Sequence, residues 1–206
     1  MNPHTLTDAD RARIREAIAA AEARTAGEIF VVVARSSDDY RFVPLLYATL
    51  IGLIVPLPLL FLTLWPALTI YLAQLVVFVV LAVVLSLPPL HMLLVPKPVK
   101  RARAHARAVE QFMAHGLHVA EARTGVLIFV SLAERYAEIV ADAGIAGRVA
   151  QAEWDRTVAT LLADIGSGKL AEGLVGAIGR AGDMLAAHFP PRPGDRNELP
   201  DELILL

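Results

Sequence analysis

Residues 42–96 form an unbroken run of 55 residues without a single Asp, Glu, Lys or Arg, and hydrophilic sequence flanks the run on both sides. A helix rises about 1.5 Å per residue, so a single helix of this length would be about 80 Å long. One bilayer crossing takes about 20 residues. The run therefore predicts a transmembrane hairpin of two helices rather than one crossing.

The limits of the two crossings follow from the residues at which helices begin and end. We place the first crossing at about 43–64, the turn at residues 65–66 and the second crossing at about 67–94. The turn is Trp followed by Pro, and Trp favours the lipid interface while Pro favours the first turn of a helix. Pro56 and Pro58 leave a second interpretation open, a shallow re-entrant hairpin, because either would kink the first helix or form the turn itself.

The sequence outside this run has the composition of a soluble domain. All 40 charged residues lie in these flanks, where they make up about a quarter of the positions, as in ordinary globular domains. We predict one discontinuous domain from residues 1–41 and 97–190, followed by a tail at 191–206. A net charge of −2 argues against nucleic-acid binding, and the absence of Cys excludes disulfides and thiolate metal sites. The charged first 40 residues predict no cleavable signal peptide.

Basic residues gather at both ends of the hairpin and are absent from its turn. The positive-inside rule therefore predicts that both flanks and both termini are cytoplasmic, in what we expect to be a bacterial inner membrane. The residues are Arg35 and Arg41 before the hairpin and Lys97, Lys100, Arg101, Arg103 and Arg107 after it.

Apolar spacing predicts a helix over 8–24 and a buried strand over 28–34 before the hairpin. The part after the hairpin predicts a helix at 100–115, strands at 125–133 and 136–142, and helices at 149–165 and 170–189. Segments 21–34 and 120–133 share nine of 14 residues and predict two related helix-turn-strand units, unless alanine-rich helix ends have simply converged.

This order of elements predicts an α/β fold. Strands 28–34 and 125–133 would be parallel, since a long crossover joins them, and the short link before 136–142 predicts an antiparallel hairpin. We expect a small three-layer αβα domain with a mixed sheet of three or four strands, interrupted by the two-helix transmembrane hairpin.

The soluble part resembles the TPM domain family, in particular a bacterial membrane branch in which a hydrophobic hairpin interrupts the domain. The matching segments are Thr25-Ala26-Gly27-Glu28-Ile29 with Glu22, Ser37-Asp38-Asp39-Tyr40, Thr124-Gly125-Val126-Leu127-Ile128, Ser131-Leu132-Ala133-Glu134-Arg135, Asp142-Ala143-Gly144-Ile145, Trp154, Gly173-Leu174, His188-Phe189-Pro190 and Asn197-Glu198-Leu199-Pro200-Asp201. The resemblance implies an αβα domain. Family members are associated with photosystem repair, with receptor-accessory roles and, in the plant branch, with weak acid phosphatase activity. Glu138 and Val140 depart from the plant-type pattern.

Polar residues that follow the predicted strands are the candidate site, because α/β sheets commonly bind ligands at the carboxyl ends of their strands. The candidate catalytic residues are Asp38, Asp39, Glu134, Arg135 and Asp142, of which Asp38, Asp39 and Asp142 are the candidate metal ligands. Such a pocket would hold a divalent cation such as Ca²⁺ or Mg²⁺ and serve phosphate-ester hydrolysis. The alternative is a solvated turn with a local Glu–Arg pair, and no organic cofactor is expected.

The histidines offer a weaker metal site. His115 and His118 are three residues apart and His105 lies one helix face away, but no fourth ligand is evident. Surface or capping roles are the alternative.

Two functions remain open at the level of sequence. One is a non-catalytic accessory or scaffold module that binds the bilayer through its hairpin and a membrane or membrane-associated protein through its domain. The other is a weak metal-dependent acid phosphatase. A pore is excluded, because Gln74 and His91 are the only strongly polar residues of the hairpin and neither makes a pathway.

Overall fold

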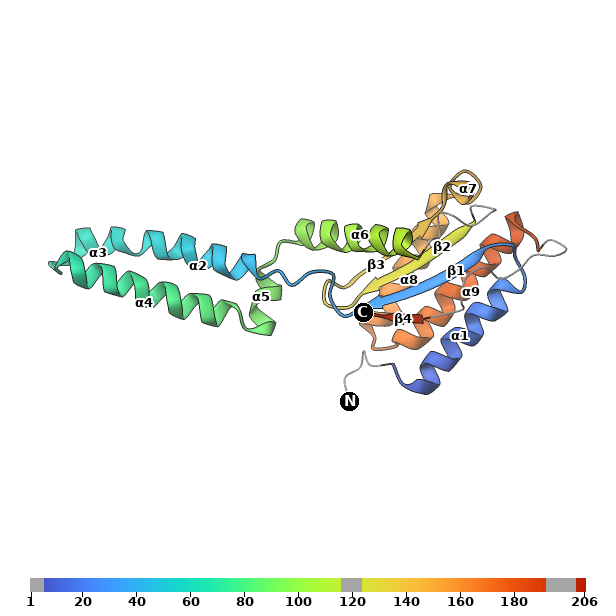
Figure 1. Cartoon of the computed structure of the whole chain (residues 1–206), viewed down its shortest axis with the longest axis horizontal. Coiled ribbons are helices and arrows are strands. Elements are labelled where there is room, and N and C mark those ends of the chain that lie inside the picture. Colours follow the sequence, from blue (N-terminus) through green and yellow to red (C-terminus); the bar gives the residue numbers. More distant parts are fainter. Residues whose placement is uncertain (1–5, 116–123, 192–202) are drawn as a thin grey trace. The chain divides into compact units, whose positions relative to one another are not determined.

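The structure is a computed structural model that describes residues 6–115, 124–191 and 203–206. The chain divides into two compact units (Figure 1). One unit contains residues 1–37 and 101–206, and the other contains residues 38–100. The sequence-based limits of the hairpin, 42 and 96, lie four residues inside those of the second unit.

The first unit is built on a four-stranded mixed sheet in the order β3-β2-β1-β4. The strands are β1 (Glu28–Ala34), β2 (Gly125–Ser131), β3 (Tyr136–Ala141) and β4 (Leu203–Leu205). β1 and β2 are parallel, β2 and β3 are antiparallel, and β4 is parallel to β1. The predicted pairings are confirmed, and the fourth strand comes from the segment that the sequence had suggested as a separate tail.

The two central strands are buried because helices cover both faces of the sheet. Ile29, Val31 and Val33 face a core formed with α1 (Asp8–Glu22), α8 (Gln151–Gly166) and α9 (Leu170–His188). Phe30 and Val32, on alternate positions of β1, face the opposite core. This accounts for the continuous apolar run in β1, where strand side chains point to alternate faces but neither face meets water.

Among the described residues, the helix that covers that opposite face is α6 (Lys97–Ala114). Ala104, Ala108 and Phe112 of α6 pack against Phe30 of β1 and Phe129 of β2. The two alanines let the helix backbone approach the sheet closely. The layers are therefore three helices, the sheet and one helix, which confirms the predicted αβα architecture.

Local sequence determines where the helices of the three-helix layer begin and how closely they pack. Thr7 and Asp10 form a capping box at the start of α1, in which the Thr7 hydroxyl accepts from the Asp10 N–H at 3.1 Å and the Asp10 carboxylate accepts from the Thr7 N–H at 3.0 Å. A Cβ at Gly182 of α9 would lie 2.7 Å from the Ala21 Cβ of α1. The contact between α1 and α9 therefore requires a glycine at this position. The remaining helix, α7 (Ala143–Ala146), is a single turn after β3.

The second unit consists of α2 (Phe42–Ile54), α3 (Pro56–Leu62), α4 (Ala67–Leu85) and α5 (Pro88–Leu94). Val55 joins α2 to α3 with helical backbone angles (φ −52°, ψ −42°), so residues 42–62 follow one helical path despite Pro56. Pro56 has no N–H to donate to the Gly52 carbonyl four residues earlier, so the path continues with one backbone hydrogen bond missing.

The second predicted crossing is shorter than expected. α4 ends at Leu85, and the chain turns at Ser86 and Leu87 before α5, whereas the sequence had predicted a helix to residue 94. Pro88 and Pro89 explain the difference, because they cannot donate the backbone hydrogen bonds that would continue α4. Residues 42–62 and 67–85 are long and apolar enough to cross a membrane, at 21 and 19 residues and mean hydropathies of 2.4 and 2.8.

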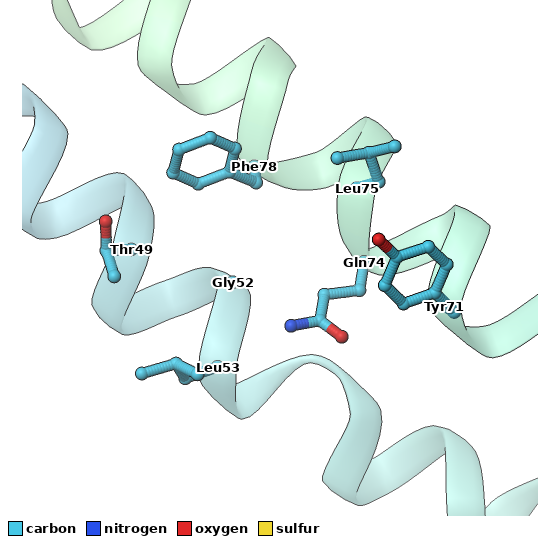
Figure 2. Close-up of a pocket in the computed structure, with 7 residues that line it drawn as sticks. All are labelled: Thr49, Gly52, Leu53, Tyr71, Gln74, Leu75 and Phe78. Carbon is cyan, nitrogen blue, oxygen red and sulfur yellow. The ribbon is translucent and has the colours of Figure 1, made fainter.

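A cavity of about 240 Å³ lies between α2 and α4 within the hairpin (Figure 2). Its lining residues are Thr49, Gly52 and Leu53 from α2 and Tyr71, Gln74, Leu75 and Phe78 from α4. Gly52 faces Phe78, and a Cβ added at Gly52 would lie 3.5 Å from the Phe78 Cβ, an ordinary van der Waals distance.

Three sequence-based expectations fall outside the described residues. They are the second copy of the Ala-Glu-Ala-Arg-Thr repeat up to Arg123, the histidine at His118, and the resemblance segment at 197–201.

Candidate functional site

Glu134 lies where the parallel strands β1 and β2 both end, in the turn between β2 and β3. Its carboxylate accepts hydrogen bonds from the Ser37 N–H at 2.9 Å, from the Ser36 hydroxyl at 3.1 Å and from the Ser131 hydroxyl. Ser131 is fully buried, and its oxygen also accepts from the Ser37 hydroxyl at 2.9 Å. The carboxylate thus ties the segment leaving β1 to the turn that leaves β2.

Arg135 follows in the left-handed region with φ 51°, and its N–H donates to the Leu132 carbonyl at 3.2 Å. An L-residue adopts this conformation at some energetic cost, and turns that require it are frequent at functional sites. The side chain of Arg135 is exposed. Arg135 therefore closes the tight turn that presents Glu134.

Asp38 and Asp39 belong to the second unit and are bonded within their own turn. The Asp38 carboxylate accepts from the Asp39 N–H at 2.7 Å, an Asx-type contact that stabilises a turn locally. Asp39 forms an exposed ion pair with Arg41 at 3.2 Å. Tyr40, which follows, has φ 50° and a buried side chain packed on Val43 and Val95.

Asp142 lies at the opposite end of β3 from Glu134. Its N–H donates to the Gly125 carbonyl at the start of β2, and its carboxylate caps α7 through the Ala143 N–H. Six residues of β3 separate the two acids, a length of about 20 Å. The structure therefore does not bring Asp142 together with Glu134, and the single converging pocket expected from the sequence is not formed by this pair.

No three His, Asp or Glu side chains within residues 6–115, 124–191 and 203–206 are grouped closely enough to hold a metal ion. A catalytic or metal-binding role for Asp38, Asp39, Glu134, Arg135 and Asp142 stays a prediction. The carboxylates of Asp38, Asp39 and Asp142 contact groups within two residues of themselves, whereas that of Glu134 reaches Ser36 and Ser37 across the strand ends.

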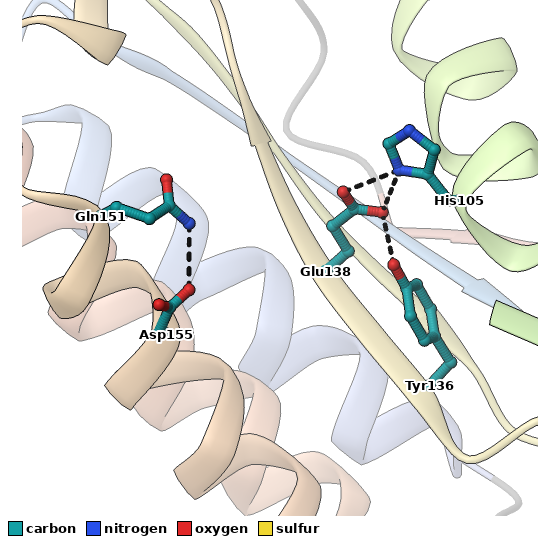
Figure 3. Close-up of polar contacts among 5 residues, drawn as sticks. All are labelled: His105, Tyr136, Glu138, Gln151 and Asp155. Carbon is teal, nitrogen blue, oxygen red and sulfur yellow. Dashed lines mark hydrogen bonds and ion pairs between the residues drawn. The ribbon is translucent and has the colours of Figure 1, made fainter. Parts of the chain in front are cut away.

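A second polar cluster, which the sequence did not predict, joins α6 to β3 (Figure 3). His105 Nδ1 lies 2.9 and 3.0 Å from the two carboxylate oxygens of Glu138, and the Tyr136 hydroxyl donates to the same carboxylate at 2.9 Å. Burial, followed by the neighbouring Glu138 carboxylate, raises the pKa of the Tyr136 phenol well above its ordinary value. Figure 3 also shows Gln151 donating to Asp155 at 3.0 Å, a contact within α8 between residues four apart.

Part of this cluster had a signal in the sequence. Tyr136 and Glu138 alternate along β3, so both must lie on one face of the sheet. Which residue of α6 contacts Glu138 on that face depends on where α6 crosses the strands. The apolar spacing of α6 does not reveal that position.

Two of the three histidines considered as zinc ligands, His105 and His115, are described, and they belong to different contacts, whereas His118 lies outside the described residues. His105 pairs with Glu138, whereas the His115 ring lies against Phe30 with ring centroids 4.5 Å apart and approaches the Gln111 side-chain oxygen at 3.3 Å. Each imidazole thus has its own contacts.

The chain is similar to known proteins in sequence and in fold. The family model described as the TPM domain matches residues 89–184. The NMR structure of the BA42 protein from the psychrophilic bacterium Bizionia argentinensis superposes with a TM-score of 0.63, covering 98% of this chain and 97% of its own, at 22% sequence identity. At this identity the superposition shows a shared fold. No curated protein sequence matches the chain.

Proposed function

We propose that this chain, which matches the TPM domain model over residues 89–184, is a membrane-anchored accessory module without catalytic activity, which binds a membrane or membrane-associated protein at the cytoplasmic face. The TPM domain supplies the binding surface, and the inserted hairpin supplies the anchor.

The observation that carries this proposal is the exposure of the hairpin. Only 11% of the most apolar window of residues 42–62 and 6% of that of residues 67–85 are buried by the rest of the unit. Leu64, Phe61 and Leu62 each expose more than four-fifths of their surface. Apolar area of this extent is costly in water, at about 25 cal/mol per Å², and a bilayer removes that cost.

The polar contacts of the domain favour a binding module over a hydrolase. Glu134 is held by three donors, and Asp142 caps a helix about 20 Å away along β3. A general base needs a lone pair directed at substrate, and a metal needs several converging oxygens. Here Glu134 accepts from two hydroxyls and one backbone N–H, and Asp142 accepts from one backbone N–H through Oδ1, while its Oδ2 is buried without a hydrogen-bond partner among the described residues.

The basic residues around the hairpin support the cytoplasmic placement. Lys97, Arg101 and Arg103 are exposed along the start of α6, and the turn at residues 63–66 carries no charge. Cations near membrane segments are retained on the cytoplasmic side.

Two experiments test the anchor and its orientation. Membranes from cells that make the full chain are washed with alkaline carbonate, and we expect the protein to remain in the pellet. Reporters fused after Leu206 and inserted at residue 65 then report the side of the membrane. We expect cytoplasmic activity at the C-terminus and periplasmic activity at the turn, and the reverse result would overturn the orientation.

A third experiment tests the absence of catalysis. Purified protein is assayed with a chromogenic phosphate ester in Ca²⁺ or Mg²⁺, beside a variant with Asp38→Asn, Glu134→Gln and Asp142→Asn. We expect no turnover that distinguishes the two. Turnover that disappears in the variant would instead support the hydrolase, and in vivo crosslinking that recovers no reproducible protein partner would remove the accessory role.

A further inference from the structure

Gln74 is a carboxamide in the middle of an apolar helix. Its side chain points from α4 into the space facing α2 (Figure 2). Within the part of the chain that the structure describes, no protein group hydrogen-bonds to this amide, which is half-buried at the edge of the cavity. The amide has two donors and an acceptor oxygen available.

The depth of Gln74 places its amide in hydrocarbon once the hairpin crosses a membrane. It lies seven residues after the start of α4 and eleven before its end, about 10 Å and 16 Å along the axis. Water is scarce at such depth, and an unpaired polar group there is unfavourable. A hydrogen-bonding partner on a neighbouring membrane segment would remove this cost.

Thr49 is the polar side chain that α2 contributes to the cavity, and it does not serve as that partner. The Thr49 hydroxyl donates to the Leu45 carbonyl of its own helix at 2.8 Å. Gly52, which also faces the cavity, has no side chain. The hairpin consequently leaves a largely apolar recess that holds the Gln74 amide and the Tyr71 hydroxyl, and Leu53, Tyr71 and Leu75 at its rim expose 62%, 60% and 46% of their surfaces.

We propose that this recess is the contact between two copies of the chain, in which Gln74 of each copy hydrogen-bonds to Gln74 of the other. This inference rests on the membrane placement proposed above. A carboxamide carries a donor and an acceptor side by side, so two of them are mutually complementary. A two-fold axis places the same residue of both copies at the centre of the interface. Side-chain amides of this kind hold transmembrane helices together.

The contact has the other properties of a membrane helix interface. Its driving force is packing and hydrogen bonding rather than apolar burial, because lipid is as apolar as leucine. The exposed leucines at the rim would exchange lipid contacts for contacts with the second copy, and the amides would gain their only hydrogen bonds. The specificity of the contact between the two copies thus comes from Gln74.

The chain allows a direct test because it contains no Cys. Leu75→Cys places a thiol at the rim of the recess, and Val76→Cys places one at nearly the same depth but about 100° around α4. Both full-length variants are reconstituted at low density in phosphatidylcholine vesicles and oxidised. We expect disulfide-linked dimers from Leu75→Cys and several-fold fewer from Val76→Cys, and equal yields would overturn the proposal.

The role of the amide is tested in the Leu75→Cys background. Gln74→Leu is expected to weaken dimerisation about tenfold, the size of one such hydrogen bond in model membrane helices, and Gln74→Asn to restore part of it. Ser86→Ala is the matched control, since the Ser86 hydroxyl already donates to the Ala82 carbonyl at 2.6 Å. An unchanged dimer yield with Gln74→Leu would exclude the amide contact.

Carbonate extraction of the same variants separates the two proposals. Variants that stay in the membrane but form no dimers contradict the second copy and leave the anchor intact. Variants that leave the membrane contradict the anchor itself. If Leu75→Cys crosslinks in cells only to another membrane protein, the recess takes a different occupant and the self-association is wrong.

Discussion

Glu134 is the residue whose expected role changes most with the structure, and a substitution can tell the two roles apart. Glu134→Ala removes the acceptor for the Ser37 N–H and for the buried Ser131 hydroxyl. Because buried donors lose their partner, we expect the free energy of unfolding of the domain to fall by about 1 to 3 kcal/mol. Urea unfolding followed by Trp154 fluorescence measures this, in a Trp65→Phe background that leaves one Trp, itself buried.

Glu16→Gln is the control for Glu134→Ala, because Glu16 is exposed on α1. It should change the unfolding free energy by no more than about 0.5 kcal/mol. Equal stabilities for the two variants would mean that the hydrogen bonds around Glu134 do not support the fold.

Gly182 gives a second prediction for a single residue. In Gly182→Ala the new Cβ would meet Ala21 at 2.7 Å to its Cβ and 3.2 Å to its Cα, and the Cα belongs to a rigid helix backbone. We expect α1 and α9 to be forced apart, with a loss of about 1 to 3 kcal/mol in the same urea experiment.

Gly179→Ala is the matched control on the same helix. A Cβ at this position has no neighbour within 4 Å, so the change should raise stability by about 0.5 to 1 kcal/mol through helix propensity. A destabilisation of the same size in both variants would show that the close approach at Gly182 does not limit packing.

At the scale of elements, the hydrogen bond that the Tyr136 phenol donates to Glu138 within β3 depends on pH. Burial and Glu138 raise the pKa of Tyr136 in the folded state above the ordinary value of 10.0. A raised pKa favours the neutral phenol in the folded state, so its contribution to stability is complete below pH 10 and is lost as the pH rises toward the folded pKa.

We therefore expect thermal unfolding of the wild type to shift to lower temperature above pH 10, and Tyr136→Phe to flatten that decline. Phe cannot ionise, whereas Tyr136 in the unfolded chain ionises near pH 10. Circular dichroism melting curves across the alkaline range provide the measurement. An identical alkaline slope in both proteins would contradict the shifted ionisation of Tyr136.

Element limits were predictable wherever local sequence determines them. The apolar run predicted β1 at 28–34, the same residues as observed, because a buried strand is bounded by Gly27 and by polar residues after Ala34. β4 was not predictable as a strand, since three residues carry no period and its pairing depends on β1 more than 160 residues away. Similarly, the position of α6 over Glu138 is a tertiary property.

The expected convergence of Asp142 on Glu134 failed for a reason that the sequence already contained. The predicted antiparallel pairing of the second and third strands returns the chain to the start of β2, where the Asp142 N–H meets the Gly125 carbonyl. The residues after β1, β2 and β4 share the carboxyl edge of the parallel strands, and Asp142 after the antiparallel β3 does not. Strand direction, and not composition, decides which carboxylates can meet.

At the scale of the whole molecule, the two units should be separable. Replacing residues 38–100 by a flexible Gly-Ser linker removes the hairpin but leaves every strand and both cores of the first unit. We expect this shortened protein to fold, with the Trp154 emission of a buried indole, and to remain in the supernatant when membranes are sedimented. The full chain, prepared in parallel, is the control.

Folding and misfolding of the shortened protein lead to different conclusions. A shortened protein that aggregates or lacks secondary structure by circular dichroism would mean that the domain depends on its insertion for folding. The hairpin limits predicted from the sequence, 42 and 96, differ by four residues from the limits of the second unit, 38 and 100. The agreement is close because the hairpin can be recognised from the absence of charged residues alone.

The arrangement of β1 between β2 and β4 also sets the timing of biosynthesis. Its two neighbours follow about 90 and about 170 residues later, and the Arg35 N–H bonds to the carbonyl of the last residue, Leu206. At a translation rate of roughly 5 to 20 residues per second, β4 is synthesised on the order of 10 to 30 seconds after β1. The hairpin emerges from the ribosome long before then. The sheet therefore gains its fourth strand only after the whole hairpin, which lies between β1 and β4 in the chain, has been synthesised.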